Sequence, residues 1–176
     1  MTIEERIASA ERALAPKFAE IDAIACYNQE KVLNAFREER IALRHFASST
    51  GYGYGDEGRD ALGRVYARAF GAERAIVSPV LLSGTHSLTV ALFGVLRPGD
   101  KVLCISGMPY DTLQGVIWGK GNGSLSDFGI SFEAIPLNDN GKIDLAATER
   151  ALASSAYAMV YIQLARWYEL RDSFTI

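Results

Sequence analysis

Ser83-Gly84-Thr85-His86 joins an apolar run to a helical pattern, and this junction is the most informative part of the chain. Upstream, residues 75–82 read AIVSPVLL and predict a largely buried strand with its exit loop. Downstream, apolar residues recur at helical spacing at Leu88, Ala91, Leu92, Val95 and Leu96. The sequence therefore predicts that Ser83, Gly84 and Thr85 begin a helix at the end of a strand.

A helix that begins at these residues can bind an anion. Its first N–H groups lack partners within the helix, the helix dipole is positive at this end, and Gly84 lets a ligand approach the backbone closely. Tyr110 follows one strand and one helix later and could reach a ring held at the same place. Two interpretations stay open: a binding site for a phosphorylated, ring-bearing cofactor, or an ordinary N-cap without any ligand.

Strand and helix patterns alternate after this junction. The predicted elements are a strand at 101–106, a helix at 111–118, a strand at 131–137, a helix from Asp144 and a strand at 158–162. Turn residues separate them at 97–100, 119–126 and 138–141. Such alternation is typical of an α/β fold with parallel strands.

Helical signals fill the N-terminal part. The sequence of residues 3–45 predicts helices, and Pro16 could start a second helix within it. Residues 49–58 form a glycine-rich loop, and Gly71 closes the helix that follows it. The loop glycines resemble a dinucleotide-binding fingerprint, but no strand precedes them, so we do not assign that motif. We expect a helical arm at 1–48 and the α/β region at 49–176.

Composition limits the function. With 176 residues, 49% of them hydrophobic, the chain can form one domain with a real core. Its net charge of −3 and lack of basic runs argue against nucleic acid as a partner. No signal-like start or membrane-length apolar stretch occurs, so we expect a cytoplasmic protein that binds no membrane. Cys26 and Cys104 read as small core residues in a reducing compartment.

Neither histidine has a metal-type neighbour in the sequence, so we predict no metal site. His86 follows the turn at Ser83 and could contact a bound ring, or it could be a first-turn helix residue that bonds to the backbone. His45 is given no role.

Several ordered segments together resemble one enzyme family. They are Phe46–Tyr54, Gly58-Arg59-Asp60, Arg64–Ala67, Phe70–Glu73, Ser83–His86, Ala91–Asp100, Pro109–Leu113 and Gly123–Ile130. This set resembles the methionine gamma-lyase-like proteins also called aluminium resistance proteins, which are pyridoxal-phosphate enzymes of the aspartate aminotransferase fold. The resemblance runs from about residue 30 to the end of the chain. It implies an N-terminal helical arm followed by an incomplete, mainly parallel sheet of the large domain.

The resemblance also implies a site. Gly84 and Thr85, beside Ser83, would bind the phosphate of pyridoxal 5'-phosphate through backbone N–H groups, and Tyr110 would stack on its pyridine ring. Tyr54 and Arg59 match a segment that reaches the phosphate of a partner subunit in the broader gamma-lyase group. Their spacing differs from the Tyr-x-Arg pattern of that group, and Arg59 could also be a solvated helix-face charge. The family acts on small sulfur amino acids and forms homo-oligomers.

The chain departs from the family where it ends. Full-length members are much longer, and their later half supplies the Schiff-base lysine and the aspartate that pairs with the pyridinium nitrogen. None of the lysines present matches the family's lysine segment; they are Lys17, Lys31, Lys101, Lys120 and Lys142. We therefore expect the N-terminal portion of a carbon–sulfur lyase-like enzyme, inactive alone. Alternatives are a non-catalytic α/β module that binds a phosphorylated ligand or a protein, and a chain that complements a separate second half.

The fold of the family predicts exposed surface in such a chain. Strands of the later half insert between those of the first half. Without them, we expect unpaired strand edges and exposed apolar faces.

Overall fold

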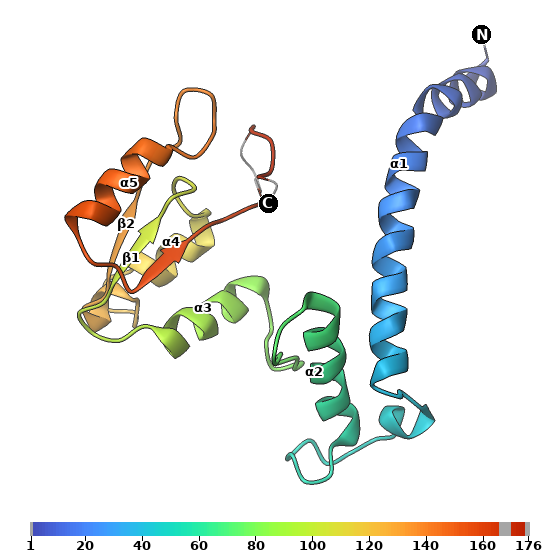
Figure 1. The fold of residues 1–176 in the computed structure, drawn as a ribbon, viewed down its shortest axis with the longest axis horizontal. Helices are drawn as coiled ribbons and strands as arrows, with labels where there is room; N and C mark the ends of the chain where they lie inside the picture. The colour runs from blue at the N-terminus through green and yellow to red at the C-terminus, as the bar shows by residue number, and fades with distance from the viewer. Residues whose placement is uncertain (1, 166–169, 175–176) are drawn as a thin grey trace. The chain divides into compact units, whose positions relative to one another are not determined.

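The computed structural model describes residues 2–165 and 170–174, which form two compact units (Figure 1). Unit 1 comprises residues 1–80 and unit 2 residues 81–176. Unit 1 contains the helices α1 (Ile3–Glu38) and α2 (Glu57–Phe70) and the short 3-10 helix η1 (Leu43–Phe46). Unit 2 contains α3 (Gly84–Val95), β1 (Lys101–Cys104), α4 (Asp111–Trp118), η2 (Ser126–Phe128), β2 (Ser131–Ala134), α5 (Leu145–Ser154) and β3 (Met159–Tyr161). The predicted boundary after residue 48 stays a prediction.

The helix α1 is continuous, so the prediction that Pro16 starts a second helix is wrong. Thr2 begins α1 with a capping box that it shares with Glu5, and the helix runs through Pro16. A proline inside a helix removes one hydrogen bond and bends the axis, but here the helical pattern on both sides carries the helix past it. Figure 1 shows α1 bent near its N-terminal end.

The contact between α1 and α2 is small. Ala35 of α1 packs with Val65 and Ala69 of α2, and Ile41 lies against them. Because the buried part of α1 is confined to Ala35, Cys26 is exposed, and the expectation of a core cysteine is wrong at this position. The helix α2 ends at Gly71, whose φ of 65° is the left-handed conformation that glycine adopts easily.

Residues 75–82 form no strand, which contradicts the prediction. Ile76 is 83% exposed and Leu82 also 83% exposed. A strand needs a neighbour to accept and donate its backbone hydrogen bonds, and the described strands offer none to this segment. This segment therefore exposes apolar side chains, and the expectation of unpaired strand edges stays a prediction.

The sheet of unit 2 is parallel, as predicted, and its strand order is β2-β1-β3. β1 is the central strand, with Leu103 opposite Glu133 on one side and Val160 on the other. The chain is thus α/β, with a small parallel sheet as the resemblance implied. The helix at 111–118 is found where it was predicted, and α5 begins after Asp144, whose side chain accepts from the Ala147 N–H at 2.8 Å.

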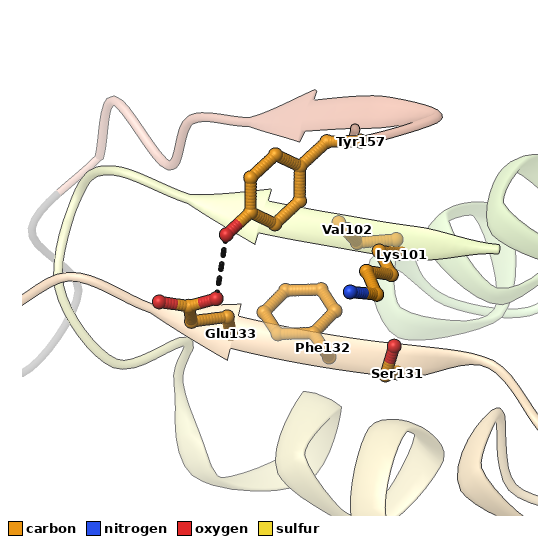
Figure 2. Close-up of a pocket in the computed structure, with 6 residues that line it drawn as sticks. All are labelled: Lys101, Val102, Ser131, Phe132, Glu133 and Tyr157. Carbon is orange, nitrogen blue, oxygen red and sulfur yellow. Dashed lines mark hydrogen bonds between the residues drawn. The ribbon is translucent and has the colours of Figure 1, made fainter. Parts of the chain in front are cut away.

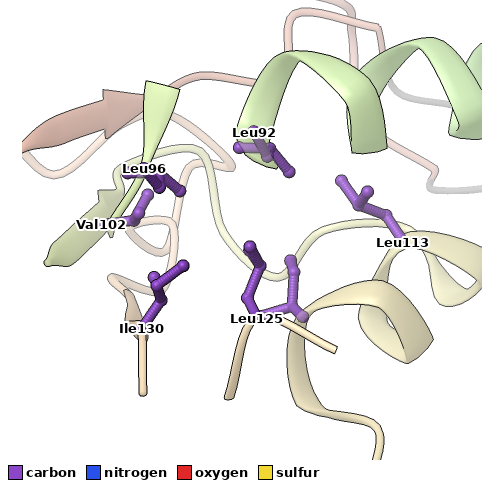
Figure 3. Close-up of a cluster of buried hydrophobic side chains, with 7 residues drawn as sticks. Leu92, Leu96, Val102, Leu113, Leu125 and Ile130 are labelled. Atoms are coloured by element: carbon purple, nitrogen blue, oxygen red, sulfur yellow. The ribbon is translucent and has the colours of Figure 1, made fainter. Parts of the chain in front are cut away.

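Both faces of this sheet are covered. One face holds the cluster in Figure 3, formed by Leu92, Leu96, Val102, Leu113, Ile117, Leu125 and Ile130. The other face buries Leu103, Ile105 and Ile135, with Ala147 and Ala151 of α5 packed against them. Cys104 is fully buried, which confirms the expectation for this cysteine. Successive residues of β1 therefore point into two different cores.

Among the described helices, none combines the length and the apolar character needed to cross a membrane.

Candidate functional site

The N-terminus of α3 presents two backbone donors. The Ser83 hydroxyl accepts from the His86 N–H at 3.0 Å, and the Ser83 carbonyl accepts from the Ser87 N–H. Within residues 2–165, the structure gives the N–H groups of Gly84 and Thr85 no acceptor. A Cβ built on Gly84 would meet no atom within 4 Å, so the space beside its backbone is open. These two donors, at the positive end of a helix, fit an anion.

Tyr110 lies at this same helix end. Its hydroxyl is 3.1 Å from the Thr85 hydroxyl, which is in turn 3.2 Å from the hydroxyl of Thr112. Tyr110 is the residue that precedes α4, and it packs against the core shown in Figure 3. The loop after β1 therefore brings Tyr110 to α3, so the structure joins two of the predicted site residues across 25 positions of sequence.

Residues from the carboxyl ends of β1 and β3 support this loop. Gln163 follows β3, and its side-chain oxygen accepts from the Tyr110 N–H at 3.3 Å. The Gln163 N–H donates to the hydroxyl of Ser106, which follows β1, at 2.7 Å. Ligands of parallel sheets bind outside the carboxyl ends of the strands, so the arrangement stands where such a site is expected.

Sequence reasoning missed Ser106, Gln163 and the hydroxyl of Thr112. Only their place in the sequence could have pointed to them, because each lies within a few residues of a predicted strand end or of Tyr110.

Two groups on β1 and β3 have raised pKa values. Burial raises the pKa of Tyr161 to about 12, and the nearby Cys104 and Tyr110 add to the shift. Burial also raises the pKa of the Cys104 thiol, whose sulfur donates to the Gly107 carbonyl. The raised pKa values keep the Tyr161 phenol and the Cys104 thiol neutral near pH 7.

The histidines bond to backbone. His86 Nδ1 accepts from the Leu82 N–H at 3.3 Å, which favours the first-turn interpretation over contact with a ring. His45 Nδ1 lies 2.9 Å from the Ala42 nitrogen. Among the described residues, no group of three or more potential metal ligands occurs.

Tyr54 and Arg59 belong to unit 1 and lie on the glycine-rich loop and the first turn of α2. The Tyr54 side chain is exposed. Arg59 Nη1 lies 3.5 Å from Asp56 Oδ2, and its guanidinium covers Gly53, where an added Cβ would meet Nη2 at 2.9 Å. Asp56 is buried, and hydrogen bonds from Ser49 and from the Gly53 N–H lower its pKa. Asp56 thus holds the loop and the arginine together.

A separate hollow of about 300 Å³ lies over the first residues of β1 and β2 (Figure 2). It is lined by Lys101, Val102, Ser131, Phe132, Glu133 and Tyr157. The Tyr157 hydroxyl donates to Glu133 Oε2 at 2.6 Å, a bond that raises the pKa of the phenol. The hollow lies where β1 and β2 begin, so we do not assign the predicted site to it.

The described residues fit one end of pyridoxal 5'-phosphate. The open N–H groups of Gly84 and Thr85 suit a phosphate dianion, and Tyr110 offers an aromatic ring beside them. Two of the described lysines have partners elsewhere: Lys17 pairs with Glu20, and Lys101 Nζ donates to the hydroxyl of Ser155.

Comparison with known proteins identifies the family. The sequence model of the methionine gamma-lyase family matches residues 3–176. Protein YnbB of Bacillus subtilis is 45% identical over 160 residues, which cover 89% of this chain and 38% of that protein.

Solved structures agree. A protein of Listeria innocua, whose name refers to cystathionine beta-lyase and aluminum resistance, shares 47% identity with a TM-score of 0.93 over 99% of this chain and 43% of that chain. A carbon-sulfur lyase involved in aluminum resistance from Clostridium novyi shares 45% identity with a TM-score of 0.86 over 91% of this chain and 39% of that chain. The chain thus spans about two fifths of the length of these relatives, and it belongs to the methionine gamma-lyase family.

Proposed function

We propose that this chain is the N-terminal portion of a pyridoxal-phosphate-dependent carbon–sulfur lyase that eliminates across a sulfur amino acid. The observation that carries the proposal is the pairing of two open N–H groups with an aromatic residue at one helix end. Gly84 and Thr85 supply the donors, and the Thr85 hydroxyl holds the hydroxyl of Tyr110 at 3.1 Å. The names of the relatives support the lyase class.

In this proposal, each residue has a binding role. The N–H groups of Gly84 and Thr85 bind the phosphate, and the dipole of α3 adds to the attraction. The Tyr110 ring stacks on the cofactor ring, with Thr85, Thr112 and Gln163 fixing its position. When bound, pyridoxal 5'-phosphate supplies an electron sink for the bond-breaking step.

The proposal extends to partners and location. Arg59, preorganised by Asp56, reaches the phosphate of a second copy together with Tyr54, since a planar guanidinium can donate two hydrogen bonds to phosphate oxygens. The whole protein is therefore a homo-oligomer that acts on small amino acids. The free thiols of Cys26 and Cys104 support a cytoplasmic location.

We further propose that the 176-residue chain is inactive by itself, because no lysine in it matches the family's lysine segment. Incubated with pyridoxal 5'-phosphate and cystathionine, the chain is expected to release no thiol above the rate of free cofactor. Release that depends on the chain would contradict this.

Replacing Gly84 tests the phosphate site. Proline at the first position of a helix removes one N–H group but keeps the helix, and the extended backbone of Ser83 accepts a following proline. Gly84→Pro should weaken binding of pyridoxamine 5'-phosphate by about tenfold or more, since a hydrogen bond to a charged group contributes about 1.5–3 kcal/mol. Pyridoxamine 5'-phosphate lacks the aldehyde that reacts with surface lysines.

Gly84→Ala is the matched control, because it adds a Cβ to the open space and keeps the N–H group. Calorimetric titration should show a larger loss for proline than for alanine, with unchanged helix content. Equal losses would contradict the role of the N–H group. Inorganic phosphate that binds as tightly as pyridoxamine 5'-phosphate would favour the alternative of a module for phosphorylated ligands.

A further inference from the structure

The hollow over the first residues of β1 and β2 is lined by one positive and one negative side chain. Its volume is about 300 Å³, and both Lys101 and Glu133 line it (Figure 2). Lys101 is paired in the sheet with Ser131, which stands two residues before Glu133. Because alternate residues of a strand share a face, the two charged side chains leave the sheet on the same side. They are therefore diagonal neighbours on adjacent strands.

Hydroxyl groups from the connection between α5 and β3 bind both charges. Lys101 Nζ donates to the Ser155 hydroxyl at 2.9 Å. The Tyr157 hydroxyl donates to Glu133 Oε2 at 2.6 Å. None of the ion pairs among the described residues joins Lys101 to Glu133. The connection thus fixes each charge at the hollow, and neither charge neutralises the other.

Both charged groups can form further hydrogen bonds. An ammonium group has three N–H donors, and among the described residues Lys101 Nζ uses one of them, on Ser155. A carboxylate accepts through two oxygens, and within residues 2–165 the bond from Tyr157 goes to Oε2 of Glu133 and leaves Oε1 open. Ser131 adds a hydroxyl to the lining. The hollow therefore offers a charged donor, a charged acceptor and a hydroxyl to a ligand.

One positive and one negative group together favour a ligand that carries both charges. A simple anion would be attracted by Lys101 and repelled by Glu133, and the reverse holds for a simple cation. A zwitterion can form a charge-assisted hydrogen bond with each of them. An α-amino acid carries its two charges on one carbon atom, which suits two side chains that are neighbours on adjacent strands. At about 300 Å³, the hollow also has the size of a small-ligand site.

We propose that this hollow binds a small free α-amino acid, with the ligand carboxylate at Lys101 and the ligand ammonium at Glu133. The inference goes beyond the proposed function and does not depend on the cofactor. The hollow lies where β1 and β2 begin, whereas Ser106 and Gln163 of the candidate site follow the carboxyl ends of β1 and β3. No residue that lines the hollow belongs to the site at α3.

Titration of the ¹⁵N-labelled chain with glycine tests the hollow, because glycine has both charges and no side chain. Binding should be weak, with half-saturation at about 10 mM, since exposed ion pairs contribute little. The amide signals of Ser131, Glu133 and Tyr157 should shift and saturate. Acetate and methylammonium, which each carry one of the two charges, should not produce these shifts at the same ionic strength. If glycine leaves these signals unchanged, or if either control ion shifts them equally, the proposal is wrong.

Neutral variants test the two charges separately. Lys101→Gln and Glu133→Gln each keep a hydrogen-bonding group and remove a charge, and each should weaken glycine binding by about threefold. Lys142→Gln is the matched control, because Lys142 is also an exposed lysine of unit 2 but does not line the hollow. Its affinity for glycine should equal that of the unchanged chain. Equal affinity in all four proteins, or an equal loss in Lys142→Gln, would contradict the proposal.

A second titration separates this inference from the proposed function. Lys101→Gln should bind pyridoxamine 5'-phosphate as the unchanged chain does, because Lys101 is not part of the site at α3. Glycine shifts confined to Gly84 and Thr85 would place the amino acid at the candidate site and overturn the inference. Loss of glycine binding in Lys101→Gln with unchanged binding of pyridoxamine 5'-phosphate would support it.

Discussion

Units 1 and 2 bury different kinds of residue. Unit 2 buries leucine and isoleucine on both faces of its sheet, whereas four of the five buried hydrophobic residues described in unit 1 are alanine. Most of the large apolar residues of unit 1 are exposed, for example Ile24 of α1, Phe70 of α2 and Ile76. Unit 2 therefore has its own core, whereas the exposed apolar residues of unit 1 are typical of a contact surface.

The largest change in stability is expected from a substitution in the core of unit 2. Leu113 is fully buried in α4, so Leu113→Ala should lower the free energy of unfolding of unit 2 by about 2–5 kcal/mol. Leu145→Ala is the control, because Leu145 is exposed at the start of α5 and its loss should change the free energy by less than about 0.5 kcal/mol. Urea unfolding followed by hydrogen exchange of β1 amides measures both. Equal effects would show that unit 2 has no specific core.

A smaller effect is expected in unit 1. Val65→Ala removes two carbon groups from the contact with Ala35, each worth roughly 0.8 kcal/mol of burial. Hydrogen exchange of α2 amides should accelerate, with no change in β1. Ile76 is exposed and serves as the control. Ile76→Ala should leave the exchange rates of the α2 amides and of the β1 amides unchanged. A change in β1 on Val65→Ala would show that the two units unfold together.

The smallest effects concern two carboxylates that hold glycine loops. In unit 2, Asp127 accepts from four N–H groups, those of Gly121, Asn122, Gly123 and Ser124, at 3.0–3.3 Å. These bonds, first that of Gly121, lower its pKa. In unit 1, hydrogen bonds from Ser49 and Gly53 lower the pKa of Asp56.

A carboxylate with a lowered folded pKa stabilises its loop above its unfolded pKa, here 3.8, and that contribution disappears as the pH falls through the folded value. From pH 7 to pH 3, exchange of the Gly123 and Gly53 amides should accelerate beyond the intrinsic effect of pH. Asp127→Asn should remove the extra dependence at Gly123 alone. If the extra pH dependence of exchange at Gly123 persists in Asp127→Asn, a group other than Asp127 causes it and the prediction is wrong.

The elements of unit 2 could be predicted from the sequence because their patterns are local. The helix at 111–118, the turn before Asp144 and the strand around Leu103 each follow from spacing and caps. The segment 75–82 could not be predicted correctly, because its composition is that of a strand but a strand also needs a neighbour. Similarly, Cys26 has the helical context of a core residue, and its exposure depends on what covers α1.

Only some of the residues of the candidate site could be predicted from the sequence. Tyr110 and Thr85 could be selected because each lies where the sequence predicts the start of a helix, although the strand predicted before Thr85 is not formed. Their contact through hydroxyl groups, and the support from Gln163, depend on the packing of β1 beside β3, which no spacing encodes. The roles of Tyr54 and Arg59 stay predictions.

In the proposed function, the helix end at Gly84 and Thr85 binds a phosphate beside Tyr110. The most direct test of this binding is titration of the ¹⁵N-labelled chain with pyridoxamine 5'-phosphate, with pyridoxamine as the control that lacks the phosphate. We predict that the amide signals of Gly84 and Thr85 shift with the phosphorylated ligand and not with pyridoxamine, and that the ring signals of Tyr110 shift with them. If the signals of these three residues stay unchanged up to the highest concentration of pyridoxamine 5'-phosphate used, the proposed phosphate site is wrong.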